Sequence, residues 1–158
     1  MTEKEKSWLS QIKLVADTRE QMPFQFKNET VRGALQTGDY SVLGLEDRIA
    51  IERKETNDLI NCLCHDRKRF QKELLRSKTL DYFAIVAECS YSSLVNGDFR
   101  SDMSPKSAIQ TLLAFSVRYR LPVFFAENAA YGAMITESLL LKFAREYWKT
   151  YIALTKDI

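Results

Sequence analysis

Several features that mark common protein classes are missing from this chain of 158 residues. No apolar run approaches the roughly 20 residues of a membrane-spanning helix, so we expect no membrane segment. The first ten residues carry no apolar core of a signal peptide, and we expect the protein to stay where it is made. Hydrophobic residues make up 46% and charged residues 28%, which excludes wholesale disorder and predicts one domain, residues 1–158, with a substantial core.

Soft metal ligands are scarce. The chain has three cysteines and one histidine, and Cys62, Cys64 and His65 stand close together. A structural zinc site needs four ligands, usually from two such clusters, and the sequence contains no second cluster. We therefore favour reduced cysteines buried on a helix of a cytoplasmic protein.

The net charge is also small. A formal value of only +2 does not by itself indicate nucleic-acid binding. Basic residues are dense in one segment, however, where Glu73 is the single acid. Such a run is often only the solvated face of a helix, and its alternative is contact with phosphates. The basic residues of this segment are Arg67, Lys68, Arg69, Lys72, Arg76 and Lys78.

The most informative stretch is residues 38–58. Apolar and polar residues alternate over residues 49–52, which predicts a half-buried strand. Side chains two apart share one face of a strand, so Glu52 and Lys54 should lie side by side while Arg53 points the other way. A second carboxylate, Asp39, follows the predicted turn at Gly38.

Two carboxylates and a lysine of this kind suit phosphodiester hydrolysis. Divalent ions such as Mg²⁺ take one or two carboxylates together with waters and substrate phosphate. A lysine beside such an ion orients or helps to deprotonate the attacking water and neutralises charge as the phosphodiester is cleaved. The stretch therefore predicts a metal-dependent nuclease strand. Because the basic run follows closely behind it, phosphate contact becomes the favoured role for that run.

The order G-D, then E-R-K-x-x-x-D, resembles the signature of XPF-type (ERCC-type) nucleases, which are structure-specific DNA endonucleases of the PD-(D/E)xK superfamily. Residues 15–20 are similar to the family's first strand, which ends in D-x-R-E. Residues 69–74 are similar to a later family helix, although Glu73 stands where glutamine is common. The resemblance runs from about residue 12 to about residue 150, after a lead-in at residues 1–10.

The resemblance implies Mg²⁺ or Mn²⁺ as cofactor, no small-molecule cofactor, and branched or otherwise structured DNA as substrate. Alternatives remain open at three positions: Asp17 is a turn cap or a metal ligand, Arg19 simply pairs with Glu20, and Asp58 is a helix-terminal charge or holds Arg53 in place. The implied roles are metal binding by Asp17, Asp39, Glu52 and, more weakly, Glu20; water activation by Lys54; phosphate stabilisation by Arg53 and Arg69; and DNA contact by Arg67, Arg69 and Lys72.

These motifs are expected on an α/β fold with a restriction-endonuclease-like core, a mixed central β-sheet flanked by helices on both faces. Loops are predicted at residues 1–10, 21–30 and 89–103. We predict helices from the N-cap Thr56 to Leu74, as one bent or two consecutive helices, and over residues 105–119 and 131–154. Strands are predicted at residues 12–17, 31–35, 39–42, 49–54, 82–87 and 121–126, the second to fourth forming an antiparallel meander.

The last predicted helix is apolar on more than one side. One stripe, expected to face the core, contains Tyr131, Met134, Ile135, Leu141 and Trp148. The resemblance implies pairing through the last helix, so we predict a two-fold symmetric homodimer built around it. The alternative is a monomer in which the N-terminal segment, with Trp8 and Leu9, covers the second face. The apolar residues beyond the stripe are Leu139, Leu140, Phe143, Tyr147 and Tyr151.

Two other functions compete with catalysis. A catalytically silent nuclease-like domain would bind DNA or a partner nuclease without cutting, but decay would remove an acid or the lysine and all are present. An interaction module with a salt-bridge ladder on its charged strand would leave the D-x-R-E and G-D motifs unexplained. A free-standing nuclease of this size is expected in a bacterium, a phage or a mobile element.

Overall fold

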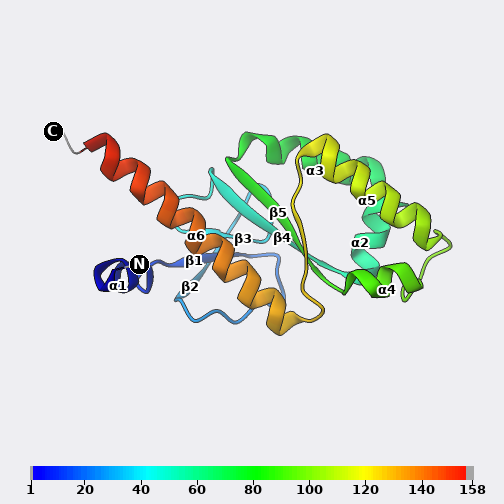
Figure 1. The fold of residues 1–158 in the computed structure, drawn as a ribbon, viewed down its shortest axis with the longest axis horizontal. Coiled ribbons are helices and arrows are strands. Elements are labelled where there is room, and N and C mark those ends of the chain that lie inside the picture. The colour runs from blue at the N-terminus through cyan, green and yellow to red at the C-terminus, as the bar shows by residue number, and fades with distance from the viewer. Residues whose placement is uncertain (1, 156–158) are drawn as a thin grey trace.

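The computed structural model describes residues 2–155 and consists of one mixed sheet between two layers of helices (Figure 1). The six strands lie in the order β2-β1-β3-β4-β5-β6, and β3 is antiparallel to both of its neighbours while the other pairs are parallel. The predicted α/β fold with a mixed sheet is confirmed. The strands are β1 (Leu14–Asp17), β2 (Thr30–Gly33), β3 (Tyr40–Val42), β4 (Ile49–Glu55), β5 (Tyr82–Glu88) and β6 (Val123–Phe125).

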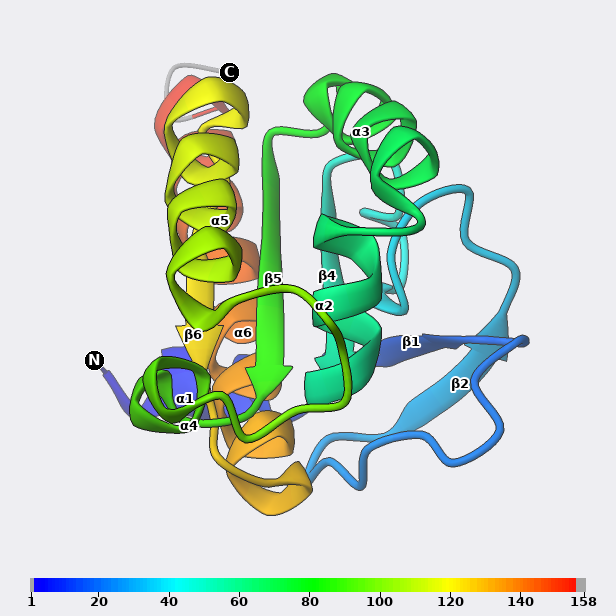
Figure 2. The ribbon, with the colours of Figure 1, turned by 90° about the vertical axis from the view of Figure 1, so that its right-hand side faces the viewer.

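Helices cover both faces of this sheet, as Figure 2 shows: α2, α3 and α5 lie on one face and α6 on the other. Among the described residues no helix is long and apolar enough to cross a membrane. The helices are α1 (Glu3–Leu9), α2 (Thr56–Leu63), α3 (Arg67–Arg76), α4 (Tyr91–Asn96), α5 (Pro105–Tyr119) and α6 (Ala129–Thr155), with a short 3₁₀ turn, η1 (Ser77–Thr79), after α3.

The central strands are buried on both sides because their alternate residues enter two separate cores. On β4, Ala50 packs under α2 and α3, while Ile49 and Ile51 pack under α6. On β5, Ile85 and Val86 divide in the same way. Successive residues of β4 therefore reach opposite faces of the sheet.

The predicted meander is confirmed for β3 and β4, which pair antiparallel, but it is wrong for β2, which pairs in parallel with β1 and not with β3. After β1 the chain crosses the face of the sheet that α6 covers, where Phe24 and Phe26 pack on Tyr40. It then returns beside β1 in the same direction. Burial of the two aromatic rings thus decides the position of β2, and strand periodicity carries no such information.

Two predicted loops contain helices, and one predicted cap is displaced. Residues 3–9 form α1, which a capping box of Thr2 and Glu5 begins. Within residues 89–103, α4 begins at Ser90, whose hydroxyl accepts a hydrogen bond from the N–H of Ser93. The N-cap of α2 is Glu55, and Thr56 is its first helical residue.

The stripe predicted to face the core on α6 is confirmed for Ile135 and Leu141, which pack against the core, and wrong for its other three residues. Tyr131 and Met134 are 50% and 58% exposed. The buried side is instead made of smaller residues, Gly132, Thr136, Leu140 and Ala144. A Cβ at Gly132 would stand 2.7 Å from Cζ of Phe24, so the glycine lets the helix approach the sheet closely. A search for large apolar residues alone overlooks this face.

Candidate active site

Strand β4 ends in four successive charged residues, and the pleat of the strand directs alternate ones to opposite faces. Glu52 and Lys54 point to the face covered by α2 and α3, where Lys54 Nζ lies 2.5 Å from Glu52 Oε1. Arg53 points to the opposite face and packs over the ring of Phe24. The predicted juxtaposition of Glu52 and Lys54 is confirmed.

Asp39 is brought to β4 by the turn that precedes β3. Its N–H donates to the carbonyl of Ile51, and its Oδ2 accepts a hydrogen bond of 2.8 Å from the N–H of Arg53. Gly38 has φ of +79°, and a Cβ there would stand 2.7 Å from Cβ of Ala50. Only glycine allows this close approach, so the G-D pair is a device that places a carboxylate beside the charged strand.

Asp39, Glu52 and Lys54 share a cavity of about 340 Å³ between β4, α2 and α3. The same cavity is lined by Glu73, which faces the strand from α3. Three arginines reach its wall, so acids at the base meet cations at the rim. The charged residues lining the cavity are Arg19, Asp39, Glu52, Lys54, Arg69, Glu73 and Arg76.

The two carboxylates on the strands are held in an environment that disfavours their charge. Burial raises the pKa of Asp39 to about 6, and the negative charges of Glu20 and Glu73 add to this, against the N–H of Arg53 and the ammonium of Lys54. Burial likewise raises the pKa of Glu52, with repulsion from Asp39 as the next cause. A cation placed between them would relieve both effects.

Lys54 remains an ammonium ion at neutral pH. Burial alone would lower the pKa of Lys54, but the charge and hydrogen bond of Glu52, with further charges from Cys62 and Glu73, raise it above its ordinary value. Its Nζ also lies 5.9 Å from the ring centroid of Phe70, a cation–π contact. In this geometry Lys54 is a positive charge and a hydrogen-bond donor, not a base.

The donors in the cavity fit a hard divalent ion. Among residues 2–155, no three His, Cys, Asp or Glu side chains are gathered closely enough to enclose a metal by themselves. Mg²⁺ does not require such a cage, since it is commonly bound by one or two carboxylates, waters and substrate phosphate. Asp39 and Glu52 provide that pair, whereas the sulfur of Cys62 in the same cavity suits softer metals.

Asp17 occupies a different position from the one implied by the resemblance. Its side chain is 1% exposed, and its two oxygens accept hydrogen bonds from the N–H of Leu35 and from the backbone and guanidinium of Arg19. Burial would raise the pKa of Asp17, but these hydrogen bonds outweigh it and lower the pKa. Asp17 thus caps the turn before β3 and orients Arg19, which pairs with it and not with Glu20.

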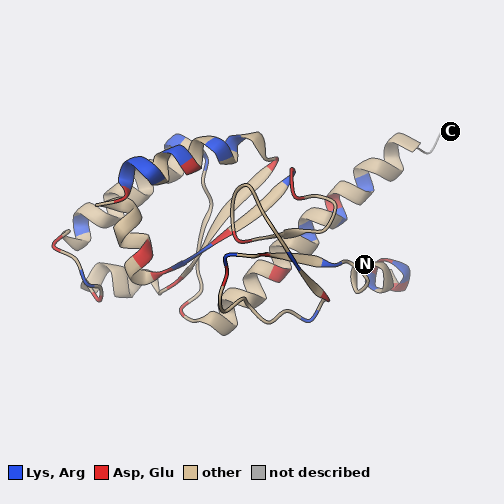
Figure 3. Ribbon diagram, turned by 180° about the vertical axis from the view of Figure 1, so that it is seen from behind, with Lys and Arg blue, Asp and Glu red and all other residues tan. Residues whose placement is uncertain are grey.

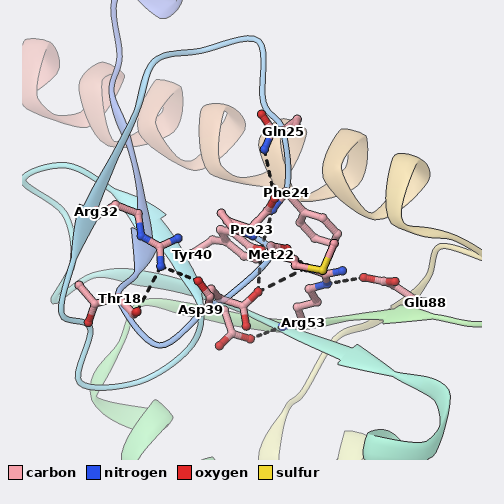
Figure 4. A network of polar contacts seen from close by, with 11 residues as sticks. Thr18, Met22, Pro23, Phe24, Gln25, Arg32, Asp39, Tyr40, Arg53 and Glu88 are labelled. Carbon is pink, nitrogen blue, oxygen red and sulfur yellow. Dashed lines mark hydrogen bonds and ion pairs between the residues drawn. The ribbon is translucent and has the colours of Figure 1, made fainter.

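Glu20 and Arg53 belong to a network on the other face of the sheet, shown in Figure 4. Arg53 donates to Glu88, to Glu20 at 3.4 Å and to the carbonyl of Met22 at 2.7 Å. Its guanidinium lies 4.2 Å from the ring centroid of Phe24. With these partners, and with a side chain 15% exposed, Arg53 is a support of the site and not a free phosphate ligand.

Of the two alternatives for Asp58, the one in which it holds Arg53 is wrong, because Glu88 and Glu20 are the carboxylates paired with Arg53. Asp58 is exposed in the first turn of α2, where a negative charge favours the helix. It lines a second cavity, of about 940 Å³, on the side of the Arg53 network.

The predicted DNA-contacting residues all lie on α3, beside the cavity that Asp39, Glu52 and Lys54 share. Arg69 lines the cavity and pairs with Asp66, while Lys72 is exposed. Arg67 lies over the ring of Phe115, 5.3 Å from its centroid. Figure 3 shows basic residues along most of α3, at the upper edge of the view.

Three residues of the site carry roles that the sequence did not indicate. Arg19 and Arg76 line the cavity, although the first stands in a loop and the second ends a helix. Tyr40 is fully buried, donates to Glu20 and accepts a hydrogen bond from the N–H of Phe24. The signal for Arg19 was its place in the D-x-R-E motif, where spacing alone favoured an ion pair.

Comparisons with known proteins identify the family and the fold. No relative is found among curated proteins. XPF from Aeropyrum pernix has a similar structure, with a TM-score of 0.66 and 21% identity over 81% of this chain. The chain covers 59% of that protein, and the likeness shows a shared fold. The model of the ERCC4 domain matches residues 15–139, from the second residue of β1 through the G-D turn and β4 to Leu139 in the first half of α6. The chain belongs to the ERCC4 domain family, with the fold of an XPF-type nuclease domain.

Proposed function

We propose that this chain is a divalent-metal-dependent DNA endonuclease that hydrolyses phosphodiester bonds in branched or otherwise structured DNA. The observation that carries the proposal is the single cavity shared by Asp39, Glu52 and Lys54, with basic side chains of α3 at its rim. Membership of a structure-specific nuclease family supports the same conclusion.

Asp39 and Glu52 would hold Mg²⁺ or Mn²⁺. When bound, such an ion polarises a phosphoryl oxygen and lowers the pKa of a coordinated water. The chain's own residues complete the site: the backbone of Arg53 fixes the carboxylate of Asp39, and Asp17 fixes Arg19 at the rim. Glu20 and Asp17, implied as ligands by the resemblance, act in this proposal by holding the arginines.

Lys54 would supply positive charge at the reacting phosphate. Since Glu52 keeps it protonated, it donates hydrogen bonds to the attacking water or to a phosphoryl oxygen and neutralises negative charge that develops during cleavage. Arg69 and Arg19 reach the same cavity and would bind the flanking phosphate oxygens.

The experiment uses supercoiled plasmid, linear duplex and a four-way or flap junction, each with Mg²⁺, Mn²⁺ or chelator. We expect cutting of the junction with either metal and none with chelator, and Glu52→Gln should be inactive. The matched control is Glu55→Gln, an exposed acid of the same strand outside the cavity, which should cut normally. Binding of junction DNA without cutting under every condition would replace this proposal with the catalytically silent domain.

The C-terminal part of α6 supports a second proposal, a homodimer. Trp8 of α1 stacks on Trp148, with ring centroids 5.2 Å apart, so the N-terminal segment covers part of the face, as the monomer alternative has it. Tyr147, Tyr151 and Leu154 nevertheless remain 40%, 53% and 75% exposed. A groove of about 620 Å³ between α1, the β3–β4 turn and α6 continues this apolar surface.

A second copy of α6 would cover these rings. Sedimentation equilibrium at micromolar protein tests this, with Tyr151→Glu and Leu154→Glu as the variants that should dissociate the dimer. A species of 18.3 kDa at all concentrations would refute it.

A further inference from the structure

Most basic residues of α3 lack acidic partners, and the same holds beyond its end. Among the described residues, none forms an ion pair with Arg67, Lys68, Lys72, Arg76 or Lys78. Elsewhere in the described part of the chain some cations, such as Lys6, Lys13 and Lys149, are paired, and others, such as Lys4, Lys27 and Lys142, are not. Over residues 67–78, however, unpaired cations follow one another closely and form one ridge of the molecule (Figure 3).

The ridge ends at a separate cavity of about 510 Å³. Figure 2 shows why it forms there: the segment joining α3 to β5 and the C-terminal end of α5 lie at the same end of the sheet. Lys78 enters the cavity from η1, and Arg118 and Arg120 enter it from the end of α5. Its remaining lining residues are Ser77, Leu80, Asp81, Phe83, Tyr119 and Leu121.

The residues lining this cavity carry a positive net charge. Its single acid, Asp81, is engaged by Arg48 at 3.2 Å, whereas Lys78, Arg118 and Arg120 have no acidic partner among residues 2–155. Lys78 Nζ lies 5.6 Å from the ring centroid of Tyr119, which directs its side chain along the cavity wall. Three cations around one polar hollow form a site for an anion.

Arg120 stands in a backbone conformation that would suit glycine. It ends α5 with φ 51° and ψ 47°, the left-handed region. Glycine is usual at this position, and a side chain there costs about 1–2 kcal/mol. The strained arginine is an independent sign that its side chain has a role, because the fold by itself would be better served by glycine.

The cavity also adjoins the catalytic one along the chain. Arg69, Glu73 and Arg76 of α3 line the catalytic cavity, and Ser77 and Lys78, next along the chain, line this one. Helix α3 therefore borders the catalytic cavity and leads into this one at its C-terminal end. One DNA backbone can thus follow α3 from one cavity to the other.

We propose that the cavity formed by Lys78, Arg118 and Arg120 binds backbone phosphate of the DNA substrate to one side of the cleaved bond. The inference rests on the proposed function, because it takes DNA as the substrate at the catalytic cavity. This second contact would fix the direction of one duplex arm and so the distance between a junction and the cut.

The test is the triple variant Lys78→Ala, Arg118→Ala, Arg120→Gly, in which glycine keeps the left-handed cap. The control variant Lys4→Ala, Lys27→Ala, Lys142→Ala removes the same charge from exposed positions away from the ridge. Fluorescence anisotropy with a labelled junction in chelator, repeated from low to high salt, gives affinity and salt slope. Melting curves of the free proteins should show Arg120→Gly to be at least as stable as the wild type.

We expect the triple variant to bind more weakly and its slope of log K against log salt to be smaller by roughly 2 to 3, since each lost phosphate contact removes about one. The control should keep the wild-type slope. With Mg²⁺ the triple variant should show a raised KM and an unchanged kcat at saturating DNA.

The outcomes separate this inference from the proposed function. Wild-type binding and cutting by the triple variant would overturn the phosphate site and leave the nuclease intact. A changed slope in a protein that cuts no DNA would support the phosphate site and overturn the nuclease. If inorganic phosphate raised the melting temperature of the wild type but not of the triple variant, while both bound DNA equally, the cavity would be a small-anion site and the inference would be wrong.

Discussion

The substitution Asp39→Asn tests the electrostatic account of the site most directly. In the protein without metal, Asp39 is an acid held beside Glu52 under burial that raises its pKa from 3.8 to about 6. Asparagine keeps the shape, and its side-chain oxygen can still accept the N–H of Arg53. The variant therefore removes a disfavoured charge and little else.

The size of the effect follows from the pKa. A shift of about 2 units corresponds to about 3 kcal/mol of destabilisation at pH values above the folded-state pKa. Between about pH 4 and pH 6 the folded protein holds this proton and the unfolded chain has lost it, so the free energy of unfolding falls as pH rises. Below pH 4 both states are protonated, and the contribution of Asp39 to stability is then independent of pH.

Thermal melting in the presence of a chelator measures the difference in stability between Asp39→Asn and the wild type. At pH 7.5 Asp39→Asn should melt above the wild type by up to roughly 6–12 °C, since 1 kcal/mol corresponds to about 2–4 °C in a domain of this size. The difference should fall to near zero at pH 4. Mg²⁺ should raise the melting temperature of the wild type and leave that of Asp39→Asn nearly unchanged.

Asp58→Asn is the matched control, because Asp58 is an exposed acid in the first turn of α2. Asp58→Asn should lower the free energy of unfolding by about 0.3–1 kcal/mol, whereas Asp39→Asn should raise it, and the effect of Asp58→Asn should not depend on Mg²⁺. Equal melting of wild type and Asp39→Asn in chelator at pH 7.5 would refute the raised pKa. If Mg²⁺ raised the melting temperatures of the wild type and of Asp39→Asn equally, Asp39 would not be a metal ligand.

Substitutions at Lys54, Arg53 and Gly38, each with a comparison variant, examine the rest of the site. Lys54→Ala should bind Mn²⁺ in calorimetry yet lower kcat by about 100-fold or more, as expected for a lost charge at the transition state, whereas Glu52→Ala should lose both metal and activity. Arg53→Ala should lower the free energy of unfolding by about 3 kcal/mol in urea melts because Glu88 and Glu20 lose their partner, and adding Glu88→Gln should recover part of that loss. Gly38→Ala should lower the free energy of unfolding by more than Gly44→Ala does, and it should weaken Mn²⁺ binding. Both glycines have positive φ, but only Gly38 lies against Ala50. Equal losses of stability in the two variants would exclude the close approach as the cause.

The parts of the fold that sequence reasoning predicted well are those with a strong local signal. Ser104 and Pro105 marked the start of α5, and the alternation around Glu52 marked β4 with the correct face for each charge. The partners of β2 and the buried side of α6 were not predictable in this way. Both depend on Phe24, a loop residue that meets Tyr40 and Gly132 only in the folded chain.

The candidate site shows the same division. Asp39, Glu52 and Lys54 were identified from strand geometry and motif, and the structure brings them into one cavity. Asp17 and Arg53 were assigned to chemistry by resemblance, but the structure surrounds them with partners that have no sequence signal: the N–H of Leu35 for one and Glu88 for the other. Ion pairs between distant segments depend on the path of the chain, which local patterns do not contain.

The two faces of the sheet differ in how completely their charged residues are paired. On the face under α2 and α3, charges are left incompletely balanced, with Asp39, Glu52 and Glu73 sharing one cavity. On the other face, Arg53, Glu20, Glu88 and Tyr40 satisfy one another and pack on Phe24. Strand β4 joins the two, since Arg53 lies between Glu52 and Lys54 and its own N–H binds Asp39. The ion pairs of Arg53 with Glu20 and Glu88 therefore fix the backbone of β4. Because the same backbone positions Glu52 and binds Asp39, these two carboxylates cannot move apart to reduce their repulsion.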